Sequence, residues 1–267
     1  MTEHEQMLTS LLDCQRADLY LDPLELSERQ REAFASMQTR RAQGEPLQYI
    51  LGTADFMGLT LKVGPRVLIP RPETEILVEE ALKVLNFSSG SLLGPRILDI
   101  GTGSGNIAIA LAKNLPSAGI VSIDASQDAL DLAFENARAH DVDAQIQFFL
   151  CPMEEYLNRS FPEDELFDMI ISNPPYIRTS ELSSLPRDVQ QEPRMALDGG
   201  EEGLKYYQLI VEKAHQLLKN NGRMILEIGD GQKPAMVQLF QKTSQYTSIE
   251  FFNDYVGTPR IVLAQKI

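Results

Sequence analysis

From residue 96 onward, the chain alternates short continuous apolar runs with longer stretches whose apolar residues recur at helical spacing. Such runs are typical of strands buried on both faces of a sheet, and the stretches between them predict amphipathic helices. Strands that alternate with helices form βαβ units, which build a parallel sheet covered by helices on both faces. The predicted strands are 96–100, 119–124, 146–150, 167–172 and 223–228, and the predicted helices include 106–114, 127–139 and 202–219.

The end of the chain has a different pattern. Segments 248–252 and 260–266 are two β-rich runs joined by a short loop, which predicts an antiparallel pair at the edge of the sheet. We therefore expect an α/β protein with a seven-stranded, Rossmann-like sheet that is mostly parallel and has antiparallel edge strands.

The N-terminal segment has helical spacing and contains no β-rich run. Ser27 and Gln30 have the spacing of a capping box, in which each side chain satisfies a backbone donor at the start of a helix. Gly44-Glu45-Pro46 ends that helix. These signals predict a small N-terminal helical domain over residues 1–45.

The character of the sequence changes between residues 46 and 70. Gly58 separates two extended stretches there, so we interpret 46–70 as a β-hairpin linker. The following Pro70-Arg71-Pro72 opens a helix with Glu73 and Glu75 in its first turn, where the helix dipole favours anions. The main domain is predicted to span 71–267.

Composition narrows the classes of function. Of the 267 residues, 43% are hydrophobic and 23% are charged, which suffices for a folded core. The net charge of −14 disfavours a surface that grips nucleic acid, because phosphate contacts need Lys and Arg. The isolated Cys14 and Cys151 predict neither a disulfide nor a metal site. Because we find no leader sequence and no long apolar run, we expect no membrane partner and a cytoplasmic location.

The first chemical signal is Gly101-Thr102-Gly103-Ser104-Gly105, between a predicted strand and a predicted helix. A glycine-rich turn of this kind lets a ligand approach the backbone closely. It differs from the dinucleotide pattern Gly-x-Gly-x-x-Gly and lacks the Gly-Lys-Ser/Thr of a phosphate-binding loop. A tight turn with purely structural glycines is the alternative at this point.

The second signal is Asp124, which ends the next predicted strand. A carboxylate at that position can accept two hydrogen bonds from a ribose diol. A carboxylate that caps the following helix is the structural alternative. Together with the glycine-rich turn, Asp124 favours an adenosine-type cofactor at the C-terminal ends of the strands.

The third signal is Asn173-Pro174-Pro175-Tyr176, at the end of the fourth predicted strand. Two prolines stiffen the loop and prevent further strand pairing. The Asn173 side-chain oxygen and a nearby backbone carbonyl are acceptors that suit a planar amino group, and the Tyr176 ring offers a face for stacking. Taken in isolation, the four residues would be a proline-rich turn with a capping asparagine.

In this combination, the motifs resemble class I S-adenosylmethionine-dependent methyltransferases that modify amino or amide nitrogen. Asn-Pro-Pro-Tyr is shared by adenine-N6 methyltransferases and by glutamine-N5 methyltransferases of translation proteins. Segments 45–52, 67–75 and 192–200 resemble the peptide chain release factor glutamine methyltransferases, and the likeness extends over nearly the whole chain. The most discriminating segment is Ile-Pro-Arg-Pro-Glu-Thr-Glu at 69–75.

The resemblance implies S-adenosylmethionine as cofactor and the glutamine of the Gly-Gly-Gln motif in class I release factors as substrate. It also implies the roles of individual residues. Pro152 stands where many relatives have an aspartate. Gly101, Thr102, Gly103, Ser104 and Gly105 would cradle the methionine end of the cofactor, Asp124 would bind its ribose, Met153 would lie near its adenine, Asn173 would border it, and Asn173, Pro174, Pro175 and Tyr176 would hold the substrate glutamine.

An adenine-N6 methyltransferase acting on DNA or RNA is the alternative, since a flipped adenine presents the same planar amino group. The net charge of −14 favours a protein substrate, as does the N-terminal helical domain, which could dock on a folded partner. A catalytically silent cofactor-binding module is disfavoured because all three motifs are intact. We expect a monomer that does not take nucleic acid as its direct substrate.

Overall fold

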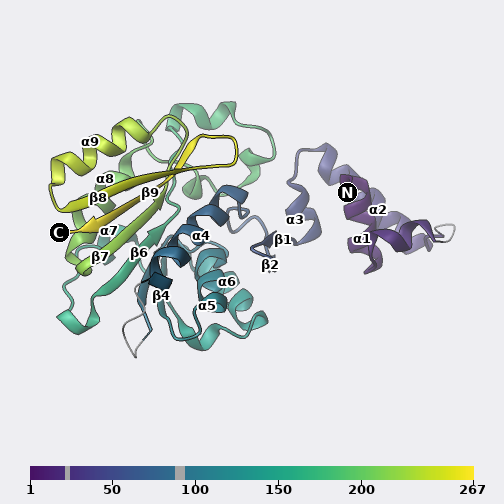
Figure 1. Ribbon diagram of the computed structural model, residues 1–267. Helices are drawn as coiled ribbons and strands as arrows, with labels where there is room; N and C mark the ends of the chain where they lie inside the picture. The colour runs from purple at the N-terminus through teal and green to yellow at the C-terminus, as the bar shows by residue number, and fades with distance from the viewer. Residues whose placement is uncertain (22–24, 88–93) are drawn as a thin grey trace.

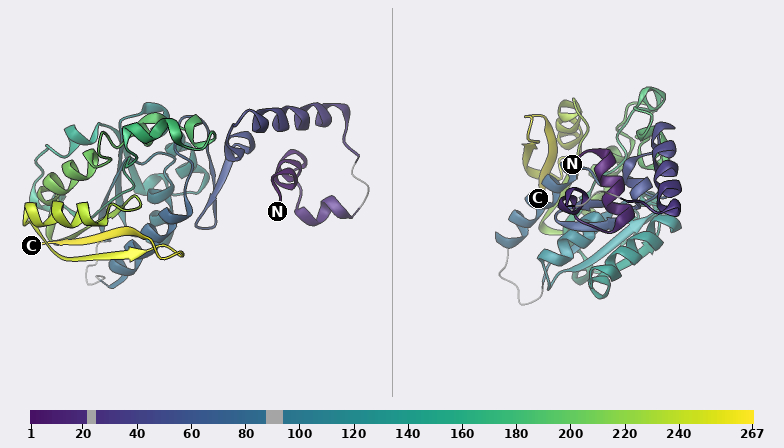
Figure 2. Two further views of the ribbon diagram at one scale, coloured as in Figure 1. Left: turned by 90° about the horizontal axis from the view of Figure 1, so that it is seen from above. Right: turned by 90° about the vertical axis from the view of Figure 1, so that its right-hand side faces the viewer.

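The structure is a computed structural model that describes residues 1–21, 25–87 and 94–267. Its N-terminal helices extend to one side of a larger α/β body, and a short hairpin lies where the two parts meet (Figures 1 and 2). Of the helices formed by the described residues, none is long and apolar enough to cross a membrane.

The body is built on one seven-stranded sheet with the order β5-β4-β3-β6-β7-β9-β8. Neighbouring strands are parallel except in the two pairs that involve β9, which lies between β7 and β8. The α/β class, the mostly parallel sheet and the antiparallel C-terminal pair are therefore confirmed, although β9 alone runs against the other strands. The strands are β3 (Arg96–Ile100), β4 (Gly119–Asp124), β5 (Ile146–Leu150), β6 (Phe167–Ser172), β7 (Leu218–Glu227), β8 (Tyr246–Asn253) and β9 (Pro259–Lys266).

Helices cover both faces of the sheet. Successive strand residues point to opposite sides, so a strand of continuous apolar residues has apolar side chains to bury on each face. In β3, Ile97 packs in one core with helices α4, α5 and α6, whereas Leu98 packs in a second core with α7, α8 and α9. Both side chains are fully buried. These helices are α4 (Pro72–Phe87), α5 (Asn106–Asn114), α6 (Gln127–Ala139), α7 (Met153–Tyr156), α8 (Lys205–Lys213) and α9 (Lys233–Thr243).

One predicted helix, 202–219, is wrong at both ends. Its start fails because Gly203 has a φ of 72°, a left-handed conformation that ends a turn rather than beginning a helix. Its end fails because the buried Leu218 pairs with Phe167 and thereby extends β7 beyond the predicted start at 223. Helix α8 therefore occupies only Lys205–Lys213, and α9 was absent from the prediction.

The N-terminal part contains α1 (Glu3–Leu12), α2 (Glu28–Ala42) and α3 (Leu47–Leu51). The predicted capping box is confirmed: the Ser27 hydroxyl accepts from the Gln30 amide, and the Gln30 side chain accepts from the Ser27 amide. The short helix α3 was not foreseen. The domain boundaries at 45 and 70 stay predictions.

The predicted hairpin is confirmed as β1 (Thr53–Phe56) and β2 (Leu59–Lys62), which pair antiparallel. Asn136, a buried residue of α6, fastens this hairpin to the body. Its side-chain oxygen accepts from the Lys62 amide, and its amide group donates to the Lys62 and Ser104 carbonyls. One side chain thus joins the hairpin to the glycine-rich turn that precedes α5.

The backbone conformation at Gly105, in this turn, and at Gly119, at the start of β4, leads us to expect different effects of alanine substitution on the free energy of unfolding. Gly105 has a φ of 81°, and an added Cβ would lie 3.0 Å from Ile109 Cδ1, whereas Gly119 has open space around the same position. We expect Gly105→Ala to lower the free energy of unfolding by about 1–3 kcal/mol. Gly119→Ala, the matched control, should change it little. Urea unfolding measures both, and equal midpoints would contradict the assignment of strain to Gly105.

Candidate active site

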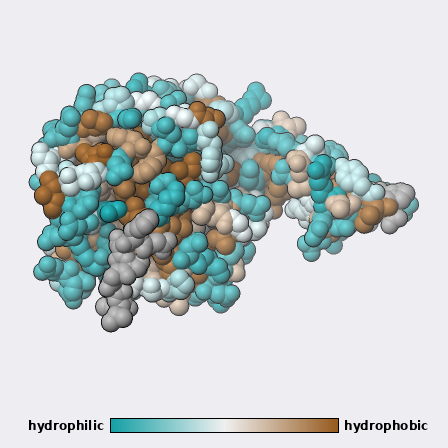
Figure 3. All heavy atoms as spheres, viewed as in Figure 1, coloured by the Kyte–Doolittle hydropathy of each residue, from teal (hydrophilic) through white to brown (hydrophobic). Residues whose placement is uncertain are grey.

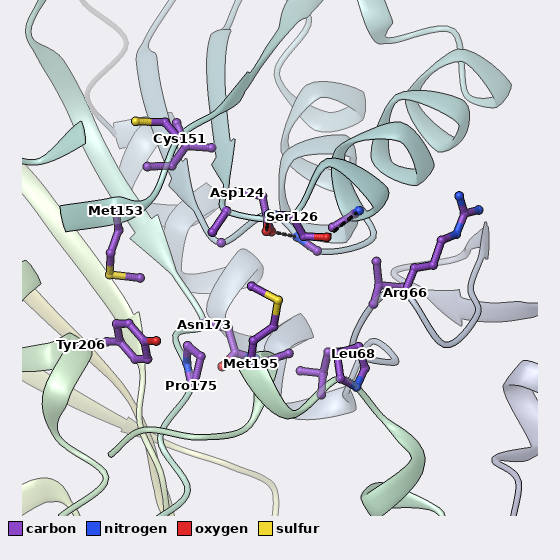
Figure 4. A pocket seen from close by; sticks show the side chains of 18 of the residues that line it. Arg66, Leu68, Asp124, Ser126, Cys151, Met153, Asn173, Pro175, Met195 and Tyr206 are labelled. Atoms are coloured by element: carbon purple, nitrogen blue, oxygen red, sulfur yellow. Dashed lines mark hydrogen bonds between the residues drawn. The ribbon is translucent and has the colours of Figure 1, made fainter. Parts of the chain in front are cut away.

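Most of the sequence-predicted site residues line two adjoining cavities at the C-terminal ends of β3, β4 and β6, and Figure 4 shows the larger of these cavities. This is the edge at which open α/β sheets bind their ligands. The two cavities share Leu68, Gly101, Gly103 and Asn173, whereas the predicted Gly105, Pro174 and Tyr176 line neither. Beyond the four shared residues, the larger cavity is lined by Arg66, Val67, Ile123, Asp124, Ala125, Ser126, Ala129, Cys151, Met153, Glu154, Pro175, Pro193, Met195, Ala196 and Tyr206. The smaller one is lined by Ile69, Pro70, Arg71, Thr74, Thr102, Ser104, Asn106 and Ile107.

The glycine-rich turn has an open backbone on its cavity side. Gly101 and Gly103 have φ values of 75° and 55°, and an added Cβ would meet no protein atom within 4 Å at either residue. The turn is fixed from behind, because the amides of Gly101 and Thr102 donate to the Ile123 carbonyl of β4. A ligand can therefore approach this backbone closely without displacing side chains.

Asp124 lies beside that turn at the end of β4. One carboxylate oxygen accepts from the Gly103 amide at 3.0 Å, and the other accepts from the Ser126 amide at 2.9 Å. Burial raises the pKa of the Asp124 carboxyl, and the hydrogen bonds from the backbone partly oppose that shift. Each oxygen keeps a further lone pair, so the carboxylate can still accept hydrogen bonds from a ligand in the cavity.

The structure places Met153 in the same cavity, as the first residue of α7. Pro152 precedes it and occupies the cap position of that short helix. Cys151 and Glu154 line the cavity on either side, and the Cys151 amide donates to the Asp124 carbonyl. The segment after β5 is thereby held next to the segment after β4.

Asn173 follows β6 and borders both cavities. Its side-chain amide donates to the Thr74 hydroxyl at 3.0 Å, and that hydroxyl donates to Glu227 at 2.6 Å. The Tyr176 hydroxyl donates to the other oxygen of Glu227 at 3.3 Å. Within the described chain, the Asn173 side-chain oxygen and the Pro174 carbonyl accept no hydrogen bond. Asn173 lines both cavities, whereas the buried Pro174 lines neither.

The remaining residues of the motif form its frame. Pro174 is buried, Pro175 lines the larger cavity, and Tyr176 packs against the second core. Gln232 donates to the Tyr176 carbonyl at 3.1 Å, which fixes the backbone at this residue.

Several cavity residues were missed by the sequence analysis. Thr74 and Leu68 lie inside the motif 67–75, but no feature of the sequence indicated that they line a cavity together with Asn173. Met195 lies inside 192–200 and also reaches the cavity (Figure 4). Arg66 and Tyr206 belong to no motif and gave no signal.

Glu227 terminates β7 as a buried residue. Burial is the main cause that raises the pKa of Glu227, to about 7. Nearby Glu73 raises it further, whereas the hydroxyls of Thr74 and Tyr176 and the charge of Arg260 lower it. No group of three His, Cys, Asp or Glu side chains suited to a metal occurs among the described residues.

Comparisons with known proteins agree with this geometry. Residues 93–255 match a family model described as a methyltransferase domain, and residues 2–52 match the PrmC N-terminal domain. A methyltransferase from Pyrococcus furiosus has a TM-score of 0.56 at 17% identity, over 90% of this chain and 99% of that one. The human Mettl16 catalytic domain, solved with an RNA hairpin, reaches 0.62 at 13% identity, over 98% and 91%. At such identities, these likenesses show the fold alone.

The body is therefore a class I methyltransferase domain, whose methyl donor is S-adenosylmethionine. Relatives named release factor glutamine methyltransferase come from Thermodesulfovibrio yellowstonii, at 39% identity over 99% of this chain and 92% of theirs, and from Geobacter sulfurreducens, at 42% over 90% and 81%. This chain belongs to the family of release factor glutamine methyltransferases.

Proposed function

We propose that this enzyme transfers the methyl group of S-adenosylmethionine to the side-chain amide nitrogen, N5, of the glutamine in the Gly-Gly-Gln motif of class I peptide chain release factors. The observation that carries the proposal is the free side-chain oxygen of Asn173, which lines the same cavity as Gly101 and Gly103, in a chain whose relatives bear that activity in their name. The adenine-N6 alternative is not favoured by these relatives.

The residues at the cavity fit the cofactor. Gly101 and Gly103 leave the space that its methionine end needs, and Thr102, Ser104 and Gly105 complete the turn. Asp124 would accept hydrogen bonds from the ribose hydroxyls, Met153 would lie against the adenine, and Asn173 would border the methionine end. When bound, the cofactor supplies an electrophilic methyl group on sulfur.

The substrate end works by positioning. An amide nitrogen is a weak nucleophile, because its lone pair is delocalised into the carbonyl. Asn173 Oδ1 and the Pro174 carbonyl would accept its two hydrogens and thus aim the nitrogen, with Pro175 and Tyr176 holding the side chain in place. These two bonds strengthen as positive charge develops on nitrogen, and such orientation contributes about 7–11 kcal/mol in favourable cases.

The N-terminal helices, assigned to a docking domain over 1–45 and joined by the linker 46–70 to the catalytic domain 71–267, would contact the release factor. In this part of the molecule Tyr20 and Leu21 are 70% and 75% exposed, and Figure 3 shows apolar side chains among hydrophilic ones on these helices. We further propose that the enzyme acts as a monomer in the cytoplasm and does not methylate nucleic acid directly.

The substrate assignment is tested by transfer of labelled methyl to a purified class I release factor. We expect label on the wild-type factor and none on a variant with Gln→Ala in its Gly-Gly-Gln motif. DNA and ribosomal RNA are incubated in parallel and should remain unlabelled. Label on nucleic acid instead would leave the fold and cofactor unchanged but overturn the substrate.

The role of Asn173 predicts a specific defect. Asn173→Ala removes the side-chain acceptor, so methylation should fall below detection while S-adenosylmethionine still binds. Turnover is followed with labelled methyl, and binding is followed by calorimetric titration. Unchanged turnover would rule out Asn173 as the group that orients the amide.

The role of Asp124 predicts the opposite defect. Asp124→Ala should cause a large loss of cofactor affinity, because the ribose loses its acceptor. In the wild type, affinity should also fall on acidification, earlier than for an ordinary aspartate, because burial raises the pKa of Asp124 and protonation removes its negative charge. Calorimetric titration across pH measures both effects, and an affinity that Asp124→Ala leaves intact would refute the assignment.

A further inference from the structure

Asn173 is bonded to a polar cluster of which the proposed chemistry uses only Tyr176. It consists of Thr74 from the first turn of α4, Glu227 from the end of β7 and Tyr176 from the motif loop. Thr74 and Glu227 are each 1% exposed, and Glu227 lines neither of the two cavities. A buried carboxylate is costly unless its oxygens are bonded, so its presence here needs an explanation.

The direction of each hydrogen bond in this cluster follows from the direction of the one before it. A carboxylate can only accept, so the single proton of the Thr74 hydroxyl points to Glu227. That hydroxyl then has only lone pairs to offer Asn173, which must present its NH2 group at 3.0 Å. The Asn173 oxygen consequently faces away from Thr74.

We propose that Glu227 and Thr74 are positioning residues that set the amide orientation of Asn173, so that its oxygen rather than its NH2 group meets the substrate. This inference rests on the proposed function and adds the group that makes Asn173 an acceptor. With the amide reversed, the NH2 groups of Asn173 and of the substrate glutamine would oppose each other, and an acceptor would be lost.

Tyr176 completes the arrangement. Its hydroxyl donates to the second oxygen of Glu227. The carboxylate therefore contacts Tyr176 directly and Asn173 through the Thr74 hydroxyl. The backbone carbonyl of Glu227 accepts from the buried Tyr207 hydroxyl at 3.0 Å, which fixes the strand end itself. The orientation of Asn173 is thus tied to the rigid sheet rather than to the loop.

The charge state of Glu227 also affects the orientation of the Asn173 amide. Among the described residues, the ionisable side chains that interact with it electrostatically include Glu73 from α4, Tyr176 from the loop, Tyr207 from α8 and Arg260 from β9. Its pKa of about 7 means that the carboxylate form is complete only above neutrality. Once protonated, Glu227 can donate to Thr74, which frees the threonine proton for Asn173 Oδ1 and permits the reversed amide. Turnover at saturating substrates should therefore fall as the pH drops through about 7.

The first test separates the Thr74 hydroxyl from its methyl group. Thr74→Val keeps the shape but removes the hydroxyl, and we expect kcat on the release factor to fall on the order of 100-fold, the effect of losing one preorganised group. Thr74→Ser keeps the hydroxyl and should restore most of the rate. A Val variant with wild-type kcat, or a Ser variant as slow as Val, would overturn the proposal.

The second test uses a readout that a merely structural role would not change. Glu227→Gln cannot ionise, so the acid limb of its kcat–pH profile near 7 should disappear. Asp168→Asn is the matched control, because Asp168 accepts from the Arg96 backbone amide and from Lys219 near the start of β6, at the end of that strand away from Asn173. It should lower the melting temperature and keep the wild-type profile.

The outcomes of these tests distinguish the inference from the proposed function. If wild-type enzyme labels no release factor, the proposed function fails before any variant is compared. If wild type is active and Glu227→Gln keeps the same acid limb, the positioning role fails while the function stands. Melting temperatures of all variants establish that each is folded at the assay temperature.

Discussion

The loop after β6 depends on a single constraint: its two consecutive prolines cannot extend the sheet, so another segment must hold it. Segment 197–203 does so. The Ile177 amide donates to the Leu197 carbonyl, and the Gly199 amide donates back to the Ile177 carbonyl. An added Cβ at Gly203 would lie 2.4 Å from the Tyr176 carbonyl oxygen, a distance that no side chain allows. Backbone packed on backbone therefore gives the motif its shape.

A similar connection fixes the segment before α4. Glu192, buried between the elements, accepts from the Ile69 amide and forms an ion pair with Arg71. The segments 67–75 and 192–200 thus pack against each other and both line the site. Both are also segments that carry the resemblance to the release factor glutamine methyltransferases. Most buried residues of these segments are apolar, and the buried carboxylate of Glu192 is satisfied by the Ile69 amide and Arg71.

Local features were predictable, and pairings between distant residues were not. The strands β3 to β6 were found at their observed bounds because continuous apolar runs of that length have few alternatives. The glycine-rich turn and Asp124 were also local, since each directly follows a strand. Thr74 and Glu227 lie 153 positions apart, and Arg71 and Glu192 lie 121 apart, so no periodicity or spacing could join them. The failed helix at 202–219 belongs to the same category, because packing against Tyr176 and Phe167 decided its ends.

The attachment of the hairpin by Asn136 has a consequence for substrate choice. Because one buried side chain binds both β2 and the backbone at Ser104, the hairpin that follows the N-terminal helices is held at a fixed position relative to the glycine-rich turn. On the docking role proposed above, a protein bound by the N-terminal helices would present to the active site only a glutamine that lies at a set distance from the bound surface. Such selectivity would depend on this distance and would not require recognition of the residues between the bound surface and the glutamine.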